Sequence, residues 1–334
     1  MRNRKNSVNF LLLALPFLPL AAGVDDESFA QQEFSLSQEA YNYLQEAIQP
    51  MEIGSINQKM IDWDVFKREV YQKASNALTP RDTYEAIKFA ISLLGDQHSF
   101  FLRPEQIDFL ETQENREMVD RIRSTLIDDH IGYLQVPSCH CLSEQTLKSY
   151  ALSLQNEIAA LDQYALDKWI VDLRGNSGGH MWPMVLGLRP LIHAEIFGFF
   201  SDGSGEFSAW RFDDLSVKNQ DFELCSLDSS SYELKHPTPK IAILVDQETA
   251  SSGEMTAIAF LGQDQTKVFG QKTGGYTSAN ELIRLSDGAA ILLATTYSAD
   301  RLGRIYRDGI TPDKIIEEKT TTLQKAVEWL EEEK

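Results

Sequence analysis

The spacing of hydrophobic residues along the chain changes near residue 131. Upstream of it, three segments carry apolar residues every three or four positions, which is the period of an amphipathic helix. The segments begin at Ser37, Asp62 and Arg81. Gly95 follows the third segment, and glycine is common directly after a helix C-terminus. The pattern therefore predicts a small bundle of three helices over roughly residues 30–95.

Downstream, short apolar runs alternate with helical patterns. The expected strands cover residues 131–137, 168–174, 240–246, 267–271 and 288–299. A helix is expected over residues 143–163, and an amphipathic helix over residues 321–334 closes the chain. Strands that alternate with helices are typical of an α/β layer structure. Two further runs, 195–202 and 205–213, predict a surface hairpin, and residues 204–238 look most like an insertion.

The composition is that of an ordinary globular protein with a net negative charge. Hydrophobic residues make up 43% of the 334 residues and charged residues 24%, so the chain can bury a sizeable core. The formal net charge is −19, because 50 acidic side chains oppose 31 basic ones. Without a basic excess to neutralise phosphates, nucleic acid and anionic lipid are not expected as partners.

The first residues have the features of an export signal. Three basic residues near the start precede an apolar run from Phe10 to Val24 that ends in small residues. This order describes a secretory signal peptide, expected here over residues 1–23. The run contains two prolines and is shorter than the about 20 residues of a membrane span. We therefore expect a periplasmic or secreted protein with no stable membrane span after cleavage; an uncleaved membrane anchor is the alternative.

The three cysteines do not predict a metal site. Cys139, Cys141 and Cys225 form an odd set, so at most one disulfide can join two of them. Cys139 and Cys141 flank His140, but one close cluster without a second ligand pair falls short of zinc spacing. Small residues at the end of a strand are the preferred interpretation.

Two adjacent serines stand where a buried strand is expected to turn into a helix. Ser251 and Ser252 follow the apolar run 241–245 in the stretch "DQETASSGEM". A serine at such a turn can be a nucleophile, with the backbone N–H of the next residue stabilising an oxyanion. It can equally cap the helix, because Ser251 and Glu254 fit the S-x-x-E capping box. The pattern is not GxSxG, so an α/β-hydrolase elbow does not fit.

Two other segments could complete a site with these serines. The stretch "VDLRGNSGG" ends a strand in a glycine turn around Gly178, which can present N–H groups to an oxyanion or be a plain tight turn. The stretch matches neither of the phosphate-loop patterns GxxxxGK[ST] and GxGxxG. His98 follows Gly95 in a loop beside two phenylalanines, where burial would keep it neutral and able to act as a base. Taken alone, His98 could also be structural.

Four ordered motifs together resemble one family. The stretches "VDLRGNSGG", "DQETASSGE", "FGQKTGGYTSAN" and "GRIYRDGITPD" are similar to motifs of the carboxyl-terminal processing (tail-specific) serine peptidases, in the branch that includes the tricorn core protease. The resemblance covers about residues 131–318, and "GDQHSF" extends it upstream. It implies an α/β catalytic domain of the crotonase type, a ββα superhelix, over residues 129–334, preceded by a helical cap region over residues 30–128.

The resemblance implies a role for each matched residue. Ser251 would be the nucleophile, the Ser252 N–H one half of the oxyanion hole and the Gly178 N–H the other half. A peptide or protein substrate would be hydrolysed through an acyl-enzyme, with no metal or organic cofactor. The family's dyad lysine would fall 25 residues after the nucleophile, where this chain has Tyr276. The tricorn-like branch takes its base from an upstream Gly-x-x-His loop, so His98 is expected as the general base.

The third catalytic group is not matched by the same motifs. The branch's glutamate, three residues before the glycine of "GVxPD", is replaced by Tyr306. Asn280 lies where the dyad branch has an orienting amide and is expected in the site. Asp300 and Glu281 are acidic candidates, of which Asp300 is preferred.

Two departures from the family pattern leave alternatives open. Only about thirty residues separate Phe101 from Ile131, fewer than the roughly 40 that an independent domain needs, so no PDZ domain is expected. The missing glutamate is also compatible with an inactive protein that binds peptides or apolar ligands on the same fold. Acyl-enzyme chemistry on an ester or another amide is a further alternative.

Overall fold

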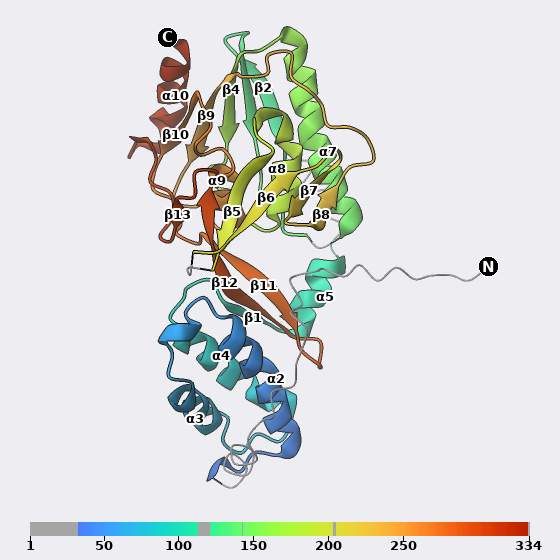
Figure 1. Cartoon of the computed structure of the whole chain (residues 1–334), viewed down its shortest axis with the longest axis vertical. Coiled ribbons are helices and arrows are strands. Elements are labelled where there is room, and N and C mark those ends of the chain that lie inside the picture. Colours follow the sequence, from blue (N-terminus) through green and yellow to red (C-terminus); the bar gives the residue numbers. More distant parts are fainter. Residues whose placement is uncertain (1–32, 113–120, 142, 203–204, 333–334) are drawn as a thin grey trace, which may run out of the picture. The chain divides into compact units, whose positions relative to one another are not determined.

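The computed structural model divides the chain into two compact units, and Figure 1 labels many of their elements. It describes residues 33–112, 121–141, 143–202 and 205–332, so the predicted signal peptide lies outside the described residues. Unit 1 contains the residues up to Pro104 and the segment Asn280–Ala294. Unit 2 contains Glu105–Ala279 and Thr295–Lys334. The chain first passes from unit 1 to unit 2 at Pro104, and the domain boundary expected at residue 128 stays a prediction.

Three helices form the core of unit 1, as the period of the apolar residues predicted. They are α2 (Gln38–Gly54), α3 (Trp63–Lys73) and α4 (Tyr84–Leu93), with the short 3-10 helices η1 (Gln58–Met60) and η2 (Pro80–Thr83) between them. The Ser37 hydroxyl caps α2 by accepting a hydrogen bond from the Ala40 N–H at 3.0 Å. Leu285, Ile291 and Leu293 complete this core from a segment far along the chain.

The segment that completes unit 1 belongs to a pair of strands. β11 (Ser278–Arg284) pairs with β12 (Ala290–Asp300), and β1 (Phe100–Leu102) pairs antiparallel with the first residues of β12. β12 continues past Ala294, so its second half belongs to unit 2. The sequence predicted β12, whereas β1 and β11 were not expected.

Unit 2 is built on a six-stranded sheet. Its strands, in spatial order, are β14 (Lys314–Ile315), β10 (Thr266–Gly270), β9 (Lys240–Val245), β4 (Lys168–Asp172), β3 (Ile131–Gln135) and β2 (Arg123–Ile127). Only the β2–β3 pair is antiparallel. The parallel pairs place the carboxyl ends of β4 and β9 at one edge, with Asp172 opposite Leu244.

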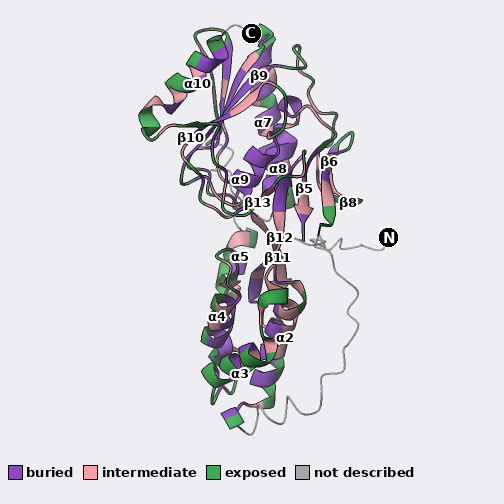
Figure 2. Ribbon diagram, turned by 60° about the vertical axis from the view of Figure 1, so that its left-hand side comes forward, coloured by how far each residue is buried: buried purple, intermediate pink, exposed green. Residues whose placement is uncertain are grey.

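Both faces of this sheet are covered, as parallel sheets require. In β9, Ile241, Ile243 and Val245 enter a core with the helices α7 (Glu144–Leu161), α8 (Met181–Gly187) and α9 (Ser252–Ile258). The alternate residues Ala242 and Leu244 pack with Trp329 of α10 (Thr322–Glu331) on the other face. Figure 2 shows β9 and α8 as almost entirely buried. The predicted α/β layer structure is therefore confirmed.

A second, antiparallel sheet in unit 2 joins β12 to β5 (Ile196–Ser201), β6 (Phe207–Phe212), β7 (Ser216–Asn219) and β8 (Phe222–Ser226). The predicted hairpin is the β5–β6 pair. The apparent insertion over residues 204–238 contributes β6, β7 and β8, and its Trp210 is completely buried. It is therefore part of the fold.

The remaining elements of the described chain are short connections. They are α5 (Pro104–Thr112), β13 (Ile305–Tyr306), which pairs with β12, and the 3-10 helices η3 (Asp162–Tyr164), η4 (Arg189–Leu191) and η5 (Lys319–Thr321). Cys139, Cys141 and Cys225 are buried, and none of the three forms a disulfide.

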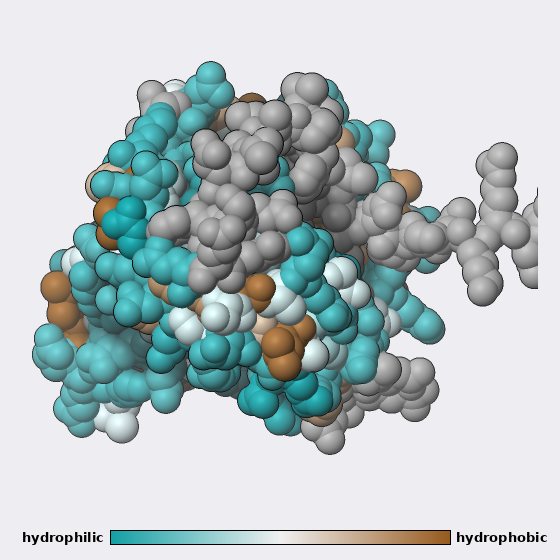
Figure 3. All heavy atoms as spheres, turned by 90° about the horizontal axis from the view of Figure 1, so that it is seen from below, coloured by the Kyte–Doolittle hydropathy of each residue, from teal (hydrophilic) through white to brown (hydrophobic). Residues whose placement is uncertain are grey.

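Hydrophobic side chains do not gather into one large patch on the face seen in Figure 3, where brown spots lie among hydrophilic residues. Across the described part of the chain, every helix is too short or too polar to cross a membrane.

Gly132 of β3 is expected to be essential for packing, because its neighbour in β4 is a buried tryptophan. A Cβ at Gly132 would lie 2.6 Å from Cε3 of Trp169. We expect Gly132→Ala to lower the free energy of unfolding by about 1–3 kcal/mol, measured by urea denaturation. The double variant Gly132→Ala/Trp169→Leu is the control, because a smaller side chain removes the clash. Its loss should be smaller than the sum of the two single losses; an additive loss would argue against the clash.

Candidate active site

The glycine turn after β4 and the serine turn after β9 pack directly against each other. The Ala250 N–H donates to the Asn176 carbonyl oxygen at 3.0 Å. A Cβ at Gly178, where φ is +103°, would lie 2.8 Å from Cβ of Ser251 and 2.9 Å from N of Ser252. Only a glycine fits this close approach. The structure therefore brings together Ser251, Ser252 and Gly178, three of the predicted site residues.

Ser251 adopts an unusual backbone conformation. Its φ of 51° and ψ of −124° are rare for a residue with a side chain, and such strain is found at functional turns. Ser251 is the N-cap of α9, and its N–H donates to Oε2 of Glu254 at 3.0 Å. This arm of the predicted capping box is present. A serine in this position can both cap the N-terminus of the helix and present its hydroxyl oxygen at the turn.

Ser252 uses its two polar groups differently. Its hydroxyl donates to the Gly179 carbonyl oxygen at 2.7 Å, and the residue is buried. Its N–H makes no hydrogen bond within the described part of the chain. The side chain therefore ties the two turns together, while the N–H can bind an oxyanion.

The N–H of Gly178 has a partner inside its own turn. It donates to Oδ1 of Asn176 at 3.0 Å, and Nδ2 of Asn176 donates to the Val136 carbonyl oxygen at 3.0 Å. Asn176 is buried, so this bond helps to shape the glycine turn. An oxyanion bound by the Gly178 N–H would have to share that N–H with Asn176.

Glu254 is completely buried. Oε1 accepts hydrogen bonds from the Thr273 hydroxyl and, at 2.9 Å, from the Gly275 N–H. Oε2 accepts from the N–H groups of Ser251 and, at 2.7 Å, Tyr276. Burial raises the pKa of Glu254, and the four hydrogen bonds oppose that rise.

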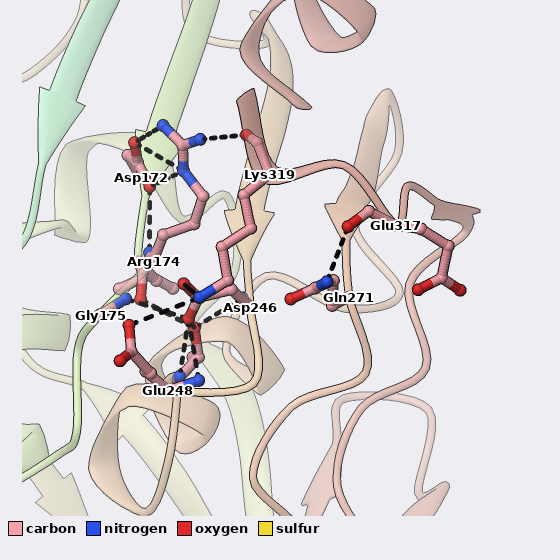
Figure 4. A network of polar contacts seen from close by, with 10 residues as sticks. Asp172, Arg174, Gly175, Asp246, Glu248, Gln271, Glu317 and Lys319 are labelled. Carbon is pink, nitrogen blue, oxygen red and sulfur yellow. Dashed lines mark hydrogen bonds and ion pairs between the residues drawn. The ribbon is translucent and has the colours of Figure 1, made fainter. Parts of the chain in front are cut away.

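Asp246, the residue after β9, holds the two turns in a similar way (Figure 4). It is buried, and its Oδ1 accepts from three backbone N–H groups at 3.0–3.1 Å, those of Gly175, Glu248 and Thr249. Its Oδ2 accepts from Nζ of Lys319 at 3.0 Å. Burial alone would raise the pKa of Asp246, but the bonds from Gly175 and Lys319 outweigh it, and the pKa is lowered.

The segment that leads into α10 is tied to this network. The Lys319 carbonyl oxygen accepts from Nη1 of Arg174 at 3.2 Å, and Arg174 also binds the carboxylate of Asp172. The Glu317 carbonyl oxygen accepts from the Gln271 side chain at 2.9 Å, as Figure 4 shows. The end of the chain thereby stabilises the loops that follow β4, β9 and β10.

His98 and Asn280 lie in unit 1. His98 is buried, and its ring meets that of Phe100 edge-on at a centroid distance of 6.0 Å. The backbone N–H of His98 donates to Oδ1 of Asp96 at 2.8 Å, and its backbone carbonyl oxygen accepts from Nδ2 of Asn280 at 2.6 Å. The structure therefore brings Asn280 to the main chain of the predicted base, within unit 1.

Asp300 lies in unit 2 and is completely buried. Its carboxylate accepts from the N–H of Leu302, the N–H and Nε of Arg304, and the hydroxyl of Tyr306, at 2.8–3.0 Å. Burial and the adjacent carboxylate raise the pKa of Tyr306. These contacts all lie within one turn, so they give Asp300 a part in shaping residues 300–306.

Two of these anchoring carboxylates were missed as site residues by the sequence interpretation. Glu254 was recognised only as half of a capping box, and its partners at residues 273–276 are too far along the chain for a local pattern to reveal. Asp246 carries one available signal, its position directly after a buried strand at the carboxyl edge of a parallel sheet.

The ion pair between Lys319 and Asp246 should make stability depend on pH. Asp246 has a lowered pKa, so its charge stabilises the fold above about pH 4 and this contribution is lost as the pH falls. We expect Lys319→Ala to lower the urea midpoint at pH 7 and to have a much smaller effect at pH 3. Lys325→Ala is the matched control, because Lys325 forms an ion pair with the exposed Glu328 on α10. An equal loss for Lys319→Ala at both pH values would contradict the assignment.

The chain is similar to known peptidases over much of its length. The family model of peptidase family S41 matches residues 130–316. A nisin-resistance protein from Lactococcus lactis subsp. lactis is 30% identical over 293 residues, which are 86% of each protein. A carboxyl-terminal-processing protease from Synechocystis sp. is 24% identical over 189 residues, which are 56% of this chain and 38% of that protease.

A solved structure shares the same architecture. The structure of a lipoprotein from Streptococcus agalactiae has a TM-score of 0.72 and 25% sequence identity, and the match covers 88% of this chain and 96% of that chain. The family match, the two relatives and this structure agree with the four motifs at the two turns and their neighbours. The chain therefore belongs to peptidase family S41, the family of the carboxyl-terminal processing proteases.

Proposed function

We propose that the protein is a serine peptidase with Ser251 as its nucleophile. The observation that carries the proposal is the strained turn of Ser251, which the glycine turn contacts on one side and Glu254 holds on the other. The adjacent Ser252 N–H, without a hydrogen bond in the described structure, supplies an oxyanion donor next to the nucleophile. A helix cap alone requires neither the strain nor the available donor.

His98 is the general base in this proposal. It takes the proton of the Ser251 hydroxyl as the oxygen attacks the peptide carbonyl, and returns it to the leaving amine. Water then hydrolyses the acyl-enzyme with His98 again as base. The bond from Asn280 to the His98 carbonyl oxygen supports the position of the base. Asp300 shapes the turn 300–306, because its four hydrogen bonds are all made within that turn.

The second oxyanion donor comes from the glycine turn. The Gly178 N–H can serve only if it shares its bond with Asn176. The Gly179 N–H makes no hydrogen bond among the described residues and is the other candidate. The close approach of Gly178 to Ser252 supports the glycine turn as the source of the second donor.

The wider assignments rest on the family and on the sequence, and they are part of the proposal. They are a crotonase-type superhelix without a PDZ domain, export through a cleaved signal over residues 1–23, and action in the periplasm or outside the cell. Substrates are peptides or proteins, and the reaction needs no cofactor. The name of the Lactococcus lactis relative directs attention to nisin as a peptide to test.

A fluorophosphonate probe, which reacts with activated serines, tests the nucleophile. We expect the wild-type protein to be labelled, and Ser251→Ala to lose labelling completely because it removes the attacking oxygen. His98→Ala should label about 10³-fold more slowly or worse, because the serine loses its base. The rates are read from a fluorescent gel over time.

The control for this experiment is Ser252→Ala, which removes only a hydroxyl that bonds to Gly179 and keeps the backbone N–H. It should still be labelled. Folded wild-type protein that takes no label would favour the alternative, an inactive protein that binds peptides or apolar ligands. Labelling that disappears in Ser252→Ala but survives in Ser251→Ala would show that Ser252, not Ser251, is the nucleophile.

The substrate class can be tested with nisin itself. We expect wild-type protein incubated with nisin to produce shorter peptides in a mass spectrum, and Ser251→Ala to leave nisin intact. A casein-derived peptide mixture in parallel reveals peptidase activity on other sequences. If the casein-derived peptides are cleaved and nisin stays intact, the peptidase assignment holds and nisin is excluded as a substrate.

A further inference from the structure

The carboxylate of Glu254 binds two segments of the chain and adjoins a third. Its four partners are the Ser251 N–H, the Thr273 hydroxyl and the N–H groups of Gly275 and Tyr276. A third segment adjoins them, since a Cβ at Gly309 would lie 3.1 Å from Oε1 of Glu254. The serine turn, the loop 273–276 and the segment at Gly309 therefore meet at one side chain.

Three of the four partners of Glu254 are N–H groups, an arrangement that favours an ionised carboxylate. The three N–H groups can only donate. The Thr273 hydroxyl accepts from the Ile310 N–H at 2.7 Å and donates to Oε1 of Glu254. No salt bridge of Glu254 occurs among the described residues, so the buried charge is balanced by these hydrogen bonds alone. A neutral side chain of the same shape cannot accept all four.

The conformation of Ser251 depends on such external support. A residue with a side chain keeps a φ of 51° only where its surroundings impose it. Gly178 limits the space beside Cβ of Ser251, and the Ala250 N–H is held by Asn176. The bond from the Ser251 N–H to Glu254 fixes the peptide plane before the serine itself.

We propose that Glu254 is a positioning residue, whose ionised carboxylate holds Ser251 in its strained conformation and aligns it with the loop 273–276. This inference rests on the proposed function of Ser251. It assigns to Glu254 a role beyond capping α9, because two of its four bonds come from the backbone of a loop that is not part of the helix. The carboxylate of Glu254 acts through the Ser251 N–H.

The experiment compares Glu254→Gln, Glu254→Asp, Thr273→Val and the control Glu328→Gln, which changes an exposed glutamate of α10. The fluorophosphonate labelling rate and, with a cleaved peptide, kcat and KM are measured per folded molecule. We expect Glu254→Gln to lower the labelling rate and kcat by about 100-fold with little change in KM, since a small displacement of a nucleophile costs that much. Thr273→Val should lose less, because three of the four bonds remain.

Amide hydrogen exchange gives a second measurement that does not need activity. In Glu254→Gln, the amides of Ser251, Gly275 and Tyr276 should all exchange faster, because they share one acceptor. Glu254→Asp keeps the charge and should recover part of both the protection and the rate. Should Glu254→Gln fail to fold, Thr273→Val tests the same carboxylate by removing one of its hydrogen-bond donors.

The outcomes separate this inference from the proposed function. If the wild-type protein takes no label, the nucleophile assignment fails, whatever the exchange data show. If the wild type is labelled and both Glu254→Gln and Thr273→Val are labelled at the wild-type rate per folded molecule, Glu254 is not a positioning residue. Slower labelling that matches only a smaller folded fraction would also overturn the proposal, whereas a loss of kcat in fully folded protein supports it.

Discussion

The turns of unit 2 depend on carboxylates that are buried and bound by backbone N–H groups. Removing a carboxylate from water is costly, and the cost is offset only where several donors converge on it. Asp246, Glu254 and Asp300 each meet this condition with two or more N–H groups. Each converts a stretch of chain without regular structure into a defined loop. The sheet supplies the platform, and these carboxylates determine the shape of what stands at its edge.

The two neighbouring serines show how such shaping divides chemistry between similar residues. Ser251 is turned into a conformation that few residues adopt, and its N–H is bound to Glu254. Ser252 donates its hydroxyl to the Gly179 carbonyl oxygen, and its N–H makes no hydrogen bond within the described part of the chain. Capping and nucleophilic attack need the same location at the start of α9, so the capping box was a correct but incomplete interpretation.

The sequence predicted those parts of the fold in which local pattern and final structure coincide. The three helices of unit 1 and the strands β3, β4, β9 and β10 have strong periodicity or long apolar runs, and these elements are where the pattern placed them. β1 and β11 were missed because their residues are held by pairing with β12, which local spacing does not reveal. Strands β7 and β8 were interpreted as an insertion because their polar residues hide the alternation that Val217 and Cys225 carry.

The sequence predicted the site residues that belong to short motifs. It did not predict the contacts between residues far apart in the chain. Ser251, Ser252 and Gly178 are in contact as the motifs implied, whereas the bond between the Gly178 N–H and Asn176 could not be inferred from the letters. Glu254 and its loop partners are separated by about twenty residues, and only the folded chain shows that one carboxylate binds both.

The return of residues 280–294 to unit 1 has a consequence for the order of events during synthesis. The helices of unit 1 are made first, but Leu285, Ile291 and Leu293, which complete their core, follow only after the long segment Glu105–Ala279 of unit 2. At elongation rates of about 5–20 residues per second, the delay is on the order of ten seconds or more. During that interval the apolar faces of the nascent helices lack part of their cover. The core of unit 1 is therefore closed late in synthesis, by residues far along the chain from the helices that they cover.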